Sequence, residues 1–374
     1  MLKKLGYLIV LAATAFVSCS NDKSGNDKET PAIIEVTNED LNFTAIGGEA
    51  IVGVSASGEW DAVTSAAWIK LTKSNTLSKQ GSVAVTVSEN TSTESRTGEI
   101  LFMSGQARKS VAVSQTGREP EPVDENIAVP DGYKLVWHDE FDGTALNRTD
   151  WTYEVQGPGW VNNELQNYVA GDIAGRKTVE LNDGILSINC IKHNSKIYSS
   201  RIYAKVNSGW KYGIFEARIK LPKGKGTWPA YWMMPVNNDF GTNPWPLCGE
   251  IDIMEEVGYN PDYTSSSIHC DAYNHVKGTQ KTAECLTQGA QDEFHIYSLE
   301  WDETGIYTSV DGKRLLSFRN DGSGNVRTWP FDKAFYLILN LAWGGDWGGA
   351  QGVDEGALPA TMQVDYVRVF QKNN

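Results

Sequence analysis

The chain has 374 residues, with 33 Lys and Arg against 47 Asp and Glu, so its formal net charge is −14. This length suggests two or more domains. A protein of this charge has no general attraction to nucleic acid or anionic lipid, and it tends to repel sulfated or uronic polysaccharides unless a local basic patch overrides that repulsion.

The first segment reads as a secretory signal. Two lysines precede an apolar run, residues 5–17, that is too short to span a bilayer, and Cys19 follows shortly after it. The ending resembles the lipobox of bacterial lipoproteins, which implies cleavage before Cys19 and acylation of its thiol. We therefore expect 1–19 to be a lipoprotein signal peptide and 20–31, which is polar, to be a disordered tether.

An acidic stretch just after Cys19 resembles the surface-export signal of Bacteroidetes lipoproteins. The resemblance implies a place in the cell envelope of a Gram-negative bacterium, with a lipid anchor in the outer membrane and exposure at the surface. Contact with a membrane is expected through this N-terminal anchor only.

Residues 32–117 predict a small all-β domain. Runs of alternating or β-branched residues are separated by clusters of Gly, Ser, Asn and Thr, without a helical period, as in 50–56, 82–87 and 110–114. This pattern favours a β-sandwich of immunoglobulin type. The segments around Trp60 and Trp68 resemble the BACON domain, for which carbohydrate binding and a spacer role both remain open. We interpret both tryptophans as core residues.

Residues 118–130 form a Pro-rich, acidic linker, which should be stiff and extended. The remainder, 131–372, is strand-rich and has no long amphipathic helix, and Asp311-Gly312 marks a tight hairpin. We expect two packed antiparallel sheets, bent so that one face is concave.

Three acids stand inside an aliphatic run at positions 250–255. Glu250 and Asp252 are two residues apart and share one face of a strand. Glu255 would point to the other face of a regular strand, but one extra residue, a β-bulge at Ile253–Met254, would bring it back. Ile251 and one of the two residues Ile253 and Met254 would then face the core.

This arrangement suits retaining glycoside hydrolysis, which needs two carboxyl groups about 5–5.5 Å apart. Glu250 and Glu255 would be ~13 Å apart between Cα atoms, a gap that two long side chains can close over a concave strand. Asp252 lies between them and helps to set which Glu keeps a proton. Taken alone, the motif also fits a solvated strand face or a calcium site.

Several segments in order resemble glycoside hydrolase family 16, in its laminarinase-like branch. They are residues 135–143, 160–166, 212–222 and 226–233, the acid motif, Trp301 and residues 364–369. The resemblance implies a concanavalin-like β-jelly roll with a sugar cleft across its concave sheet. It also implies that Glu250 is the nucleophile, Glu255 the acid/base and Asp252 the residue between them. Glu256 is surplus to the pattern and should point away from the cleft.

Further positions carry over from the same resemblance. Trp228 and Trp232 match aromatics that floor the negative subsites, where a sugar ring stacks on an indole; core packing is the alternative for both. Asn163 and Arg201 match polar residues that hold the sugar two units from the cleavage point. His269 matches a histidine near the acid/base, where it could bind a sugar hydroxyl or tune Glu255.

Trp343 opens a glycine-dense segment and is expected at the positive subsites, with a plain surface loop as the alternative. Glu140 and Asp365 match a structural Ca²⁺ site on the convex side of many family members. Calcium binds several oxygen ligands, of which the sequence shows two candidate carboxylates. No cofactor is required for the reaction, and the presence of a structural Ca²⁺ ion stays open.

Apart from Cys19, four cysteines could pair outside the cytoplasm, with a Cys270–Cys285 bridge as one possibility; the four are Cys190, Cys248, Cys270 and Cys285. None has the C-x-x-C spacing of a zinc site. The sequence leaves their pairing open.

The sequence as a whole predicts a monomeric, retaining endo-β-glucanase. Its partner would be a β-glucan, either β-1,3-glucan (laminarin) or mixed-linkage β-1,3/1,4-glucan, which the sequence does not separate. The alternatives are a non-catalytic glycan-binding lipoprotein of the cell surface and a family member that acts on another polysaccharide. The bulged motif and the acidic charge disfavour sulfated galactans.

Overall fold

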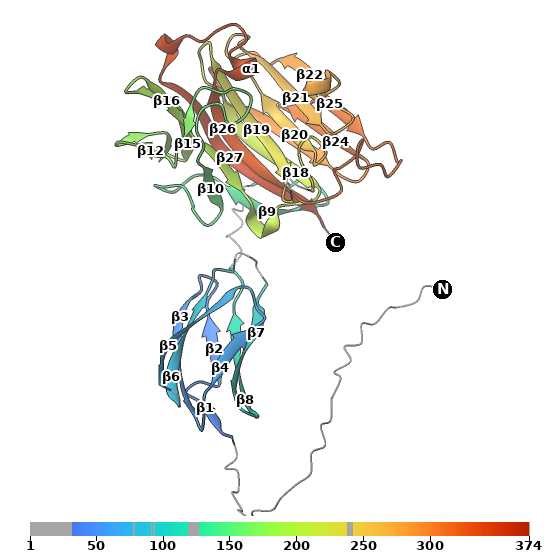
Figure 1. The fold of residues 1–374 in the computed structure, drawn as a ribbon. Helices are drawn as coiled ribbons and strands as arrows, with labels where there is room; N and C mark the ends of the chain where they lie inside the picture. The colour runs from blue at the N-terminus through green and yellow to red at the C-terminus, as the bar shows by residue number, and fades with distance from the viewer. Residues whose placement is uncertain are drawn as a thin grey trace, which may run out of the picture. The chain divides into compact units, whose positions relative to one another are not determined.

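The computed structural model describes residues 32–77, 79–90, 92, 94–118, 127–237 and 242–373. The predicted signal peptide with Cys19, the tether 20–31 and most of the linker lie outside the described residues. The chain divides into two compact units, and Gly48–Ser88 with Thr97–Ser114 makes up most of the first and Gln115–Asn374 most of the second (Figure 1). Among the described residues, no helix has the length and apolar character needed to span a bilayer.

The first unit is a sandwich of two four-stranded sheets. One sheet has the order β1 (Ile34–Val36), β3 (Gly48–Ala56), β6 (Gln80–Val87), β5 (Ile69–Leu77), and the other has the order β2 (Asp40–Phe43), β8 (Ala107–Gln115), β7 (Arg96–Ser104), β4 (Asp61–Thr64). Trp60 lies in the core between them and Trp68 packs against that core. The predicted immunoglobulin-like sandwich is confirmed, and both tryptophans have the core role expected of them.

Two larger sheets stacked face to face form the second unit. The seven-stranded sheet has the order β10 (Trp151–Glu154), β17 (Arg201–Ala204), β26 (Phe335–Trp343), β19 (Thr227–Pro235), β20 (Glu250–Glu255), β21 (Tyr263–His269), β22 (Lys281–Leu286). The ten-stranded sheet has the order β11 (Asn167–Tyr168), β16 (Lys196–Ser199), β15 (Ile185–His193), β27 (Ala360–Lys372), β18 (Gly213–Lys220), β23 (His295–Trp301), β24 (Gly305–Val310), β25 (Lys313–Arg319), with β14 (Val179–Asn182) on β15 and β9 (Tyr133–Asp139) on β27.

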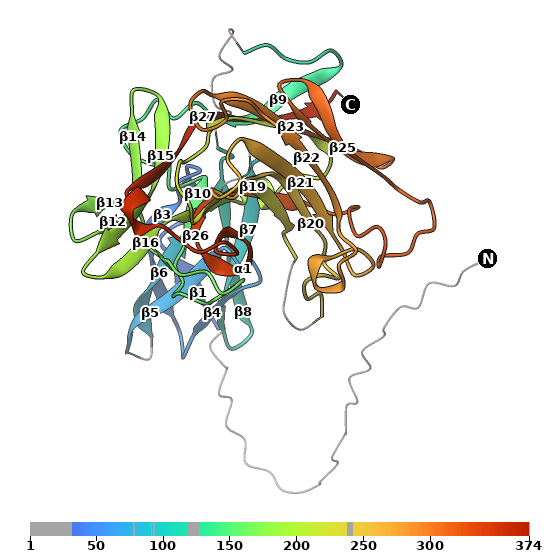
Figure 2. The same cartoon turned by 90° about the horizontal axis from the view of Figure 1, so that it is seen from above.

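Short elements complete the second unit. They are the strand pair β12 (Asp172–Ile173) and β13 (Arg176–Lys177), the helical turns η1 (Val206–Ser208), η2 (His275–Lys277) and η3 (Glu355–Ala357), and the four-residue helix α1 (Gly345–Gly348). The two large sheets curve in the same sense, with the seven-stranded sheet on the inner side (Figure 2). The predicted jelly-roll sandwich is confirmed.

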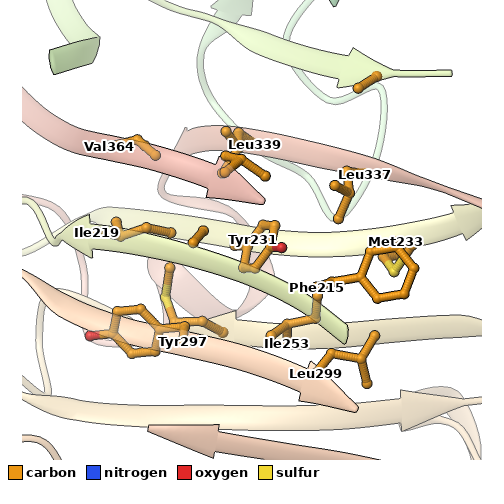
Figure 3. Packing of buried hydrophobic residues seen from close by; sticks show 14 of the residues in the cluster. Phe215, Ile219, Tyr231, Met233, Ile253, Tyr297, Leu299, Leu337, Leu339 and Val364 are labelled. Atoms are coloured by element: carbon orange, nitrogen blue, oxygen red, sulfur yellow. The ribbon is translucent and has the colours of Figure 1, made fainter. Parts of the chain in front are cut away.

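Alternation along the strands builds the core between the sheets. Phe215 and Ile219 of β18 and Tyr231 and Met233 of β19 are fully buried and face one another across the interior (Figure 3). Because successive side chains of a strand point to opposite faces, the residues between the buried ones of β19 point away from the core. We call this side of the seven-stranded sheet, turned away from the ten-stranded sheet, the open face.

The four cysteines among the described residues are free. The Sγ atom of Cys270 lies 3.7 Å from the carbonyl oxygen of Thr328, whereas Cys285 lies against the hydroxyl groups of Thr264 and Thr287. The Cys270–Cys285 bridge that the sequence left open is therefore not formed.

Candidate active site

Strand β20 carries the three acids, and its pairing contains a bulge. Against β21, Asp252 pairs with Ser267 and Glu255 with Ser265, so three steps along β20 match two steps along β21. The pairing with β19 shifts at the same place. The predicted bulge is confirmed, and the extra residue returns Glu255 to the open face, on which Asp252 lies.

Both bulge residues lie in the core. Ile253 is 1% exposed and Met254 is fully buried, and Ile253 is visible among the residues between the sheets (Figure 3). The prediction that only one of them faces the core is wrong, because two successive side chains of the bulge turn to the same side. Their burial holds the bulge in place and with it the spacing of the acids.

Glu250, Asp252 and His269 form a tight cluster. The Nε2 atom of His269 is 3.2 Å from Oδ2 of Asp252 and 3.9 Å from Oε1 of Glu250. One ligand atom from each of the three lies within 4.8 Å of the others, which is close enough to hold a metal ion. Because His269 pairs with Glu250 across the strands, its contacts are at the Glu250 end of the motif rather than at Glu255.

The electrostatics of the cluster favour bound protons. Burial is the largest effect and raises the pKa of Glu250, Asp252 and Glu255, and the charge of Asp252 raises the pKa of both glutamates further. Three neighbouring carboxylates shielded from water cannot all ionise at low cost. The cluster therefore keeps at least one carboxyl group protonated near neutral pH, as general acid catalysis requires.

Trp228 contacts Glu255 directly. Its indole Nε1 donates a hydrogen bond to Oε1 of Glu255 at 3.0 Å, which opposes the effect of burial and lowers the pKa of this carboxyl. Its ring packs edge-on against Trp347, with 5.6 Å between the centroids. The sequence places Trp228 on the floor of the negative subsites, whereas the structure gives its indole nitrogen a role at Glu255.

Arg201 lies between two indole rings on the same open face. Its guanidinium carbon is 5.0 Å from the ring centroid of Trp160 and 4.6 Å from that of Trp232. The side chain is only 9% exposed, so these cation–π contacts restrict it strongly. The structure thus brings Arg201 and Trp232 together beside the acids and adds Trp160 to them.

With this geometry in place, the comparisons with known proteins decide the family. The family model of Glycosyl hydrolases family 16 matches residues 167–368. The chain belongs to glycoside hydrolase family 16. The model of the Viral BACON domain matches residues 33–118, which form the first unit and the segment that leaves it.

Relatives within family 16 carry β-glucanase names. A relative named Beta-glucanase, from Rhodothermus marinus, is 43% identical over 248 residues, covering 64% of this chain and 85% of that protein. Glucan endo-1,3-beta-glucosidase A1 of Niallia circulans is 37% identical over 276 residues, covering 67% of this chain and 39% of that protein. The solved structure of the laminarinase from Rhodothermus marinus matches with a TM-score of 0.61 at 41% identity, covering 65% of this chain and 98% of that chain.

The structure contradicts the expected role of Trp343 and gives Asn163 a contact within the protein, while the sugar contact of Asn163 stays a prediction. Trp343 is fully buried in the core at the end of β26, so its expected place at the positive subsites is wrong, because neither ring face is open to a sugar. Asn163 is exposed, and its side-chain amide donates to Oδ1 of Asp346 at 2.8 Å. Asn163 therefore fastens its own loop to the segment of α1.

The two carboxylates expected at the calcium site of family 16 are paired with arginines. Both carboxylate oxygens of Glu140 accept hydrogen bonds from Arg368, at 2.9 and 2.7 Å. Asp365 accepts one at 2.6 Å from a different guanidinium, that of Arg218. Each carboxylate has an arginine as partner, which a calcium ion would have to displace or share, so Glu140 and Asp365 as metal ligands stay a prediction.

Sequence reasoning missed several side chains beside the acids. Trp245 lies in a turn and His275 begins the helical turn η2, and the ring of His275 is 4.9 Å from that of Trp245 and 5.2 Å from that of His269. Glu164 lies in the segment 160–166 that carried the family resemblance, but the sequence indicated no role for it or for Tyr168. The alternation of polar residues at 164, 166 and 168 was the one signal that pointed to a shared face.

Proposed function

We propose that this family 16 protein is a retaining endo-β-glucanase that hydrolyses β-1,3-glucan or mixed-linkage β-1,3/1,4-glucan. The observation that carries the proposal is the bulge of β20, which sets Asp252 and Glu255 on one open face beside Trp228 and Trp232. The names of the relatives, Beta-glucanase and Glucan endo-1,3-beta-glucosidase A1, support the substrate class.

The proposed reaction proceeds in two displacements. In the first, a carboxylate oxygen of Glu250 bonds to the anomeric carbon while the glycosidic bond breaks, and the carboxylic acid of Glu255 gives its proton to the departing oxygen. In the second, Glu255 takes a proton from water, and the hydroxide oxygen replaces Glu250 at the anomeric carbon. Esterification of Glu250 removes a nearby negative charge, which lowers the pKa of Glu255 between the two steps.

Neighbouring groups support this division of roles. The positive charge of Arg201 and that of His269 when protonated lower the pKa of Glu250, which favours its ionised, nucleophilic form. Trp228 stabilises the carboxylate form of Glu255 by its hydrogen bond. The steps need no redox group or metal ion.

The test is reducing-end release by the purified protein from laminarin, barley β-glucan and keratan sulfate, with the products resolved by size and linkage. We expect hydrolysis of the glucans and a loss of about 10³-fold or more in Glu250→Gln and in Glu255→Gln. Glu256→Gln makes the same chemical change one residue further on and should retain activity at pH 5. Full activity in either of the first two variants would reject the assignment.

This outcome also separates the rival functions. A non-catalytic glycan-binding protein would release no reducing ends from any polymer. Keratan sulfate is included because a relative from Sphingobacterium multivorum, 30% identical, is named Keratan-sulfate endo-1,4-beta-galactosidase, and an enzyme of that specificity would prefer it to both glucans. The rates of product release from laminarin and from barley β-glucan are then compared. The faster substrate decides between a preference for β-1,3-glucan and one for mixed-linkage glucan.

We also propose that the protein is a lipoprotein, anchored at Cys19 and exposed at the outer membrane. The support is the sequence of residues 1–19. Incorporation of a labelled fatty acid should occur in the native chain and be abolished in Cys19→Ala. A native chain without label would contradict the anchor.

A further inference from the structure

A chain of hydrogen bonds runs from Trp232 into the interior. The indole Nε1 of Trp232 donates to Oδ1 of Asn340 at 2.7 Å. The amide Nδ2 of Asn340 donates to the hydroxyl oxygen of Tyr168 at 3.2 Å, and this hydroxyl donates to Oε2 of Glu164 at 3.1 Å. The chain joins β19, β26 and β11 to the segment before β11.

Every member beyond Trp232 is withdrawn from water. Glu164 is 7% exposed, Tyr168 2% and Asn340 6%. A buried carboxylate is costly unless its oxygens are satisfied. Gln166 supplies a second bond to Oε2 of Glu164 at 2.7 Å, and its own Oε1 accepts from the backbone N–H of Trp343 at 2.8 Å. Glu164 is therefore fixed to the fully buried end of β26.

The charge of Glu164 also reaches the open face. Arg201, which pairs with Asn340 across the strands and packs on Trp232, is the cation that acts on Glu164. Glu164 also acts on Glu255 of the catalytic motif, because its negative charge raises the pKa of Glu255. Among the described residues, Tyr168 is the titratable group that hydrogen-bonds Glu164.

We propose that Glu164 is a positioning residue of the glucanase, which orients the ring of Trp232 through Tyr168 and Asn340. The proposal rests on the proposed function, because Trp232 and Arg201 matter to the reaction only when a sugar lies on them. Two effects of Glu164 can be tested separately. Its hydrogen bond from Tyr168 bears on the position of Trp232, and its negative charge raises the pKa of Glu255.

Two variants separate the geometry from the charge. Tyr168→Phe breaks the hydrogen-bond chain and keeps the charge of Glu164, so we expect KM for laminarin to rise about tenfold with little change in kcat and an unchanged pH profile. Glu164→Gln keeps an acceptor oxygen for Tyr168 but removes the charge. We expect nearly unchanged KM at the pH optimum and a basic limb of kcat/KM that moves to lower pH, because the pKa of Glu255 falls.

The matched control is Tyr366→Phe. Its hydroxyl also donates to a glutamate, Oε1 of Glu216 at 2.8 Å, but on the ten-stranded sheet. This variant should leave KM and the pH profile as they are in the native protein. If Tyr168→Phe does not fold, Asn340→Ser removes the middle link of the chain from β26 and is read in the same way.

A measurement without substrate tests the positioning role of Glu164 separately from the proposed glucanase function. The indole Nε1–H resonance of Trp232, assigned with Trp232→Phe, should shift or broaden in Tyr168→Phe and stay in place in Tyr366→Phe. If the native protein hydrolyses no glucan, the proposed function fails, and this resonance still tests the hydrogen-bond chain. An unchanged resonance together with an unchanged KM in Tyr168→Phe would overturn the positioning role.

Discussion

Two opposing effects act on Glu255. Burial raises its pKa, and the hydrogen bond from Trp228 lowers it. We predict that Trp228→Phe, which loses the N–H and keeps most of the ring, raises the pKa of Glu255 and moves the basic limb of kcat/KM to higher pH. A loss of about tenfold in kcat/KM at the optimum should accompany the shift, since a bond to a charged group is lost. Trp232→Phe is the comparison, because its indole bonds to Asn340 and not to an acid.

Glu256 offers a second test at the scale of one side chain, this time of stability. It is fully buried, and its carboxylate accepts from the backbone N–H of Asp262 at 2.6 Å and from Gln291 at 3.1 and 3.2 Å. These contacts agree with the expectation that it points away from the open face. Burial raises its pKa from 4.5 to about 8.

The sign of the effect follows from linkage. Because the folded state binds this proton more tightly, the stabilisation from Glu256 is full below pH ~4.5 and is lost as the pH rises through about 8. We predict that Glu256→Gln matches the native protein in free energy of unfolding near pH 4.5 and exceeds it by about 5 kcal/mol near pH 9. Denaturant unfolding across this range measures the difference, and parallel curves for the two proteins would contradict it.

Single residues also show where prediction from sequence stops. The spacing of Glu250, Asp252 and Glu255 was enough to predict their shared face, because strand alternation and one bulge are local rules. The prediction of Trp343 at the positive subsites failed because its burial depends on the packing of the second sheet against β26, which the sequence does not display. The arginine partners of Glu140 and Asp365 were not predictable either, because 228 and 147 residues of chain separate the two members of these pairs.

At the scale of elements, the hairpin between β24 and β25 shows a local rule that suffices. Asp311 and Gly312 have φ angles of 48° and 74°, as a two-residue turn that matches strand twist requires. No heavy atom lies within 4 Å of a Cβ built on Gly312, so a side chain there meets only backbone strain. We predict that Gly312→Ala lowers the free energy of unfolding by ~1 kcal/mol.

The matched variant is Gly312→Asn, because Asn tolerates the left-handed region better than Ala. It should cost clearly less than Gly312→Ala in the same unfolding experiment. Equal costs for the two variants would mean that the turn relaxes to another geometry. The turn, like the bulge of β20, is an element that the sequence predicts because few residue types satisfy its backbone angles.

Sheet order is the part of the fold that strand patterns do not supply. The strands of residues 213–220 and 360–372 were predictable one by one, but β18 and β27 are neighbours in space across more than a hundred residues of chain. The resemblance to family 16 implied the jelly roll as a whole and named no strand pairs. The pattern of residues therefore predicted the strands and the shared face of the acids, and the resemblance predicted the architecture.

At the scale of the whole molecule, the two units have separate hydrophobic cores. The cluster of the first unit extends from Ile34 to Val113, and the cluster of the second from Trp137 to Val369. None of the described residues belongs to both clusters, so each core buries its own apolar surface, which is the property of a domain that folds alone. The acids, Trp228, Trp232 and Arg201 all belong to the second unit.

We therefore predict that a chain of residues 118–374 folds and hydrolyses soluble laminarin oligosaccharides with a kcat/KM within about twofold of the full protein. Position 118 is the starting point because the guanidinium of Arg118 bonds the buried carboxylate of Asp150. On an insoluble β-glucan the two proteins should also act at similar rates, since Trp60 lies in the core of the first unit and Trp68 packs against that core, which leaves little ring surface for a sugar. A selective loss on the insoluble polymer would instead assign sugar binding to residues 32–117, whereas a loss on both substrates with an intact unfolding transition would show that the first unit contributes to the reaction.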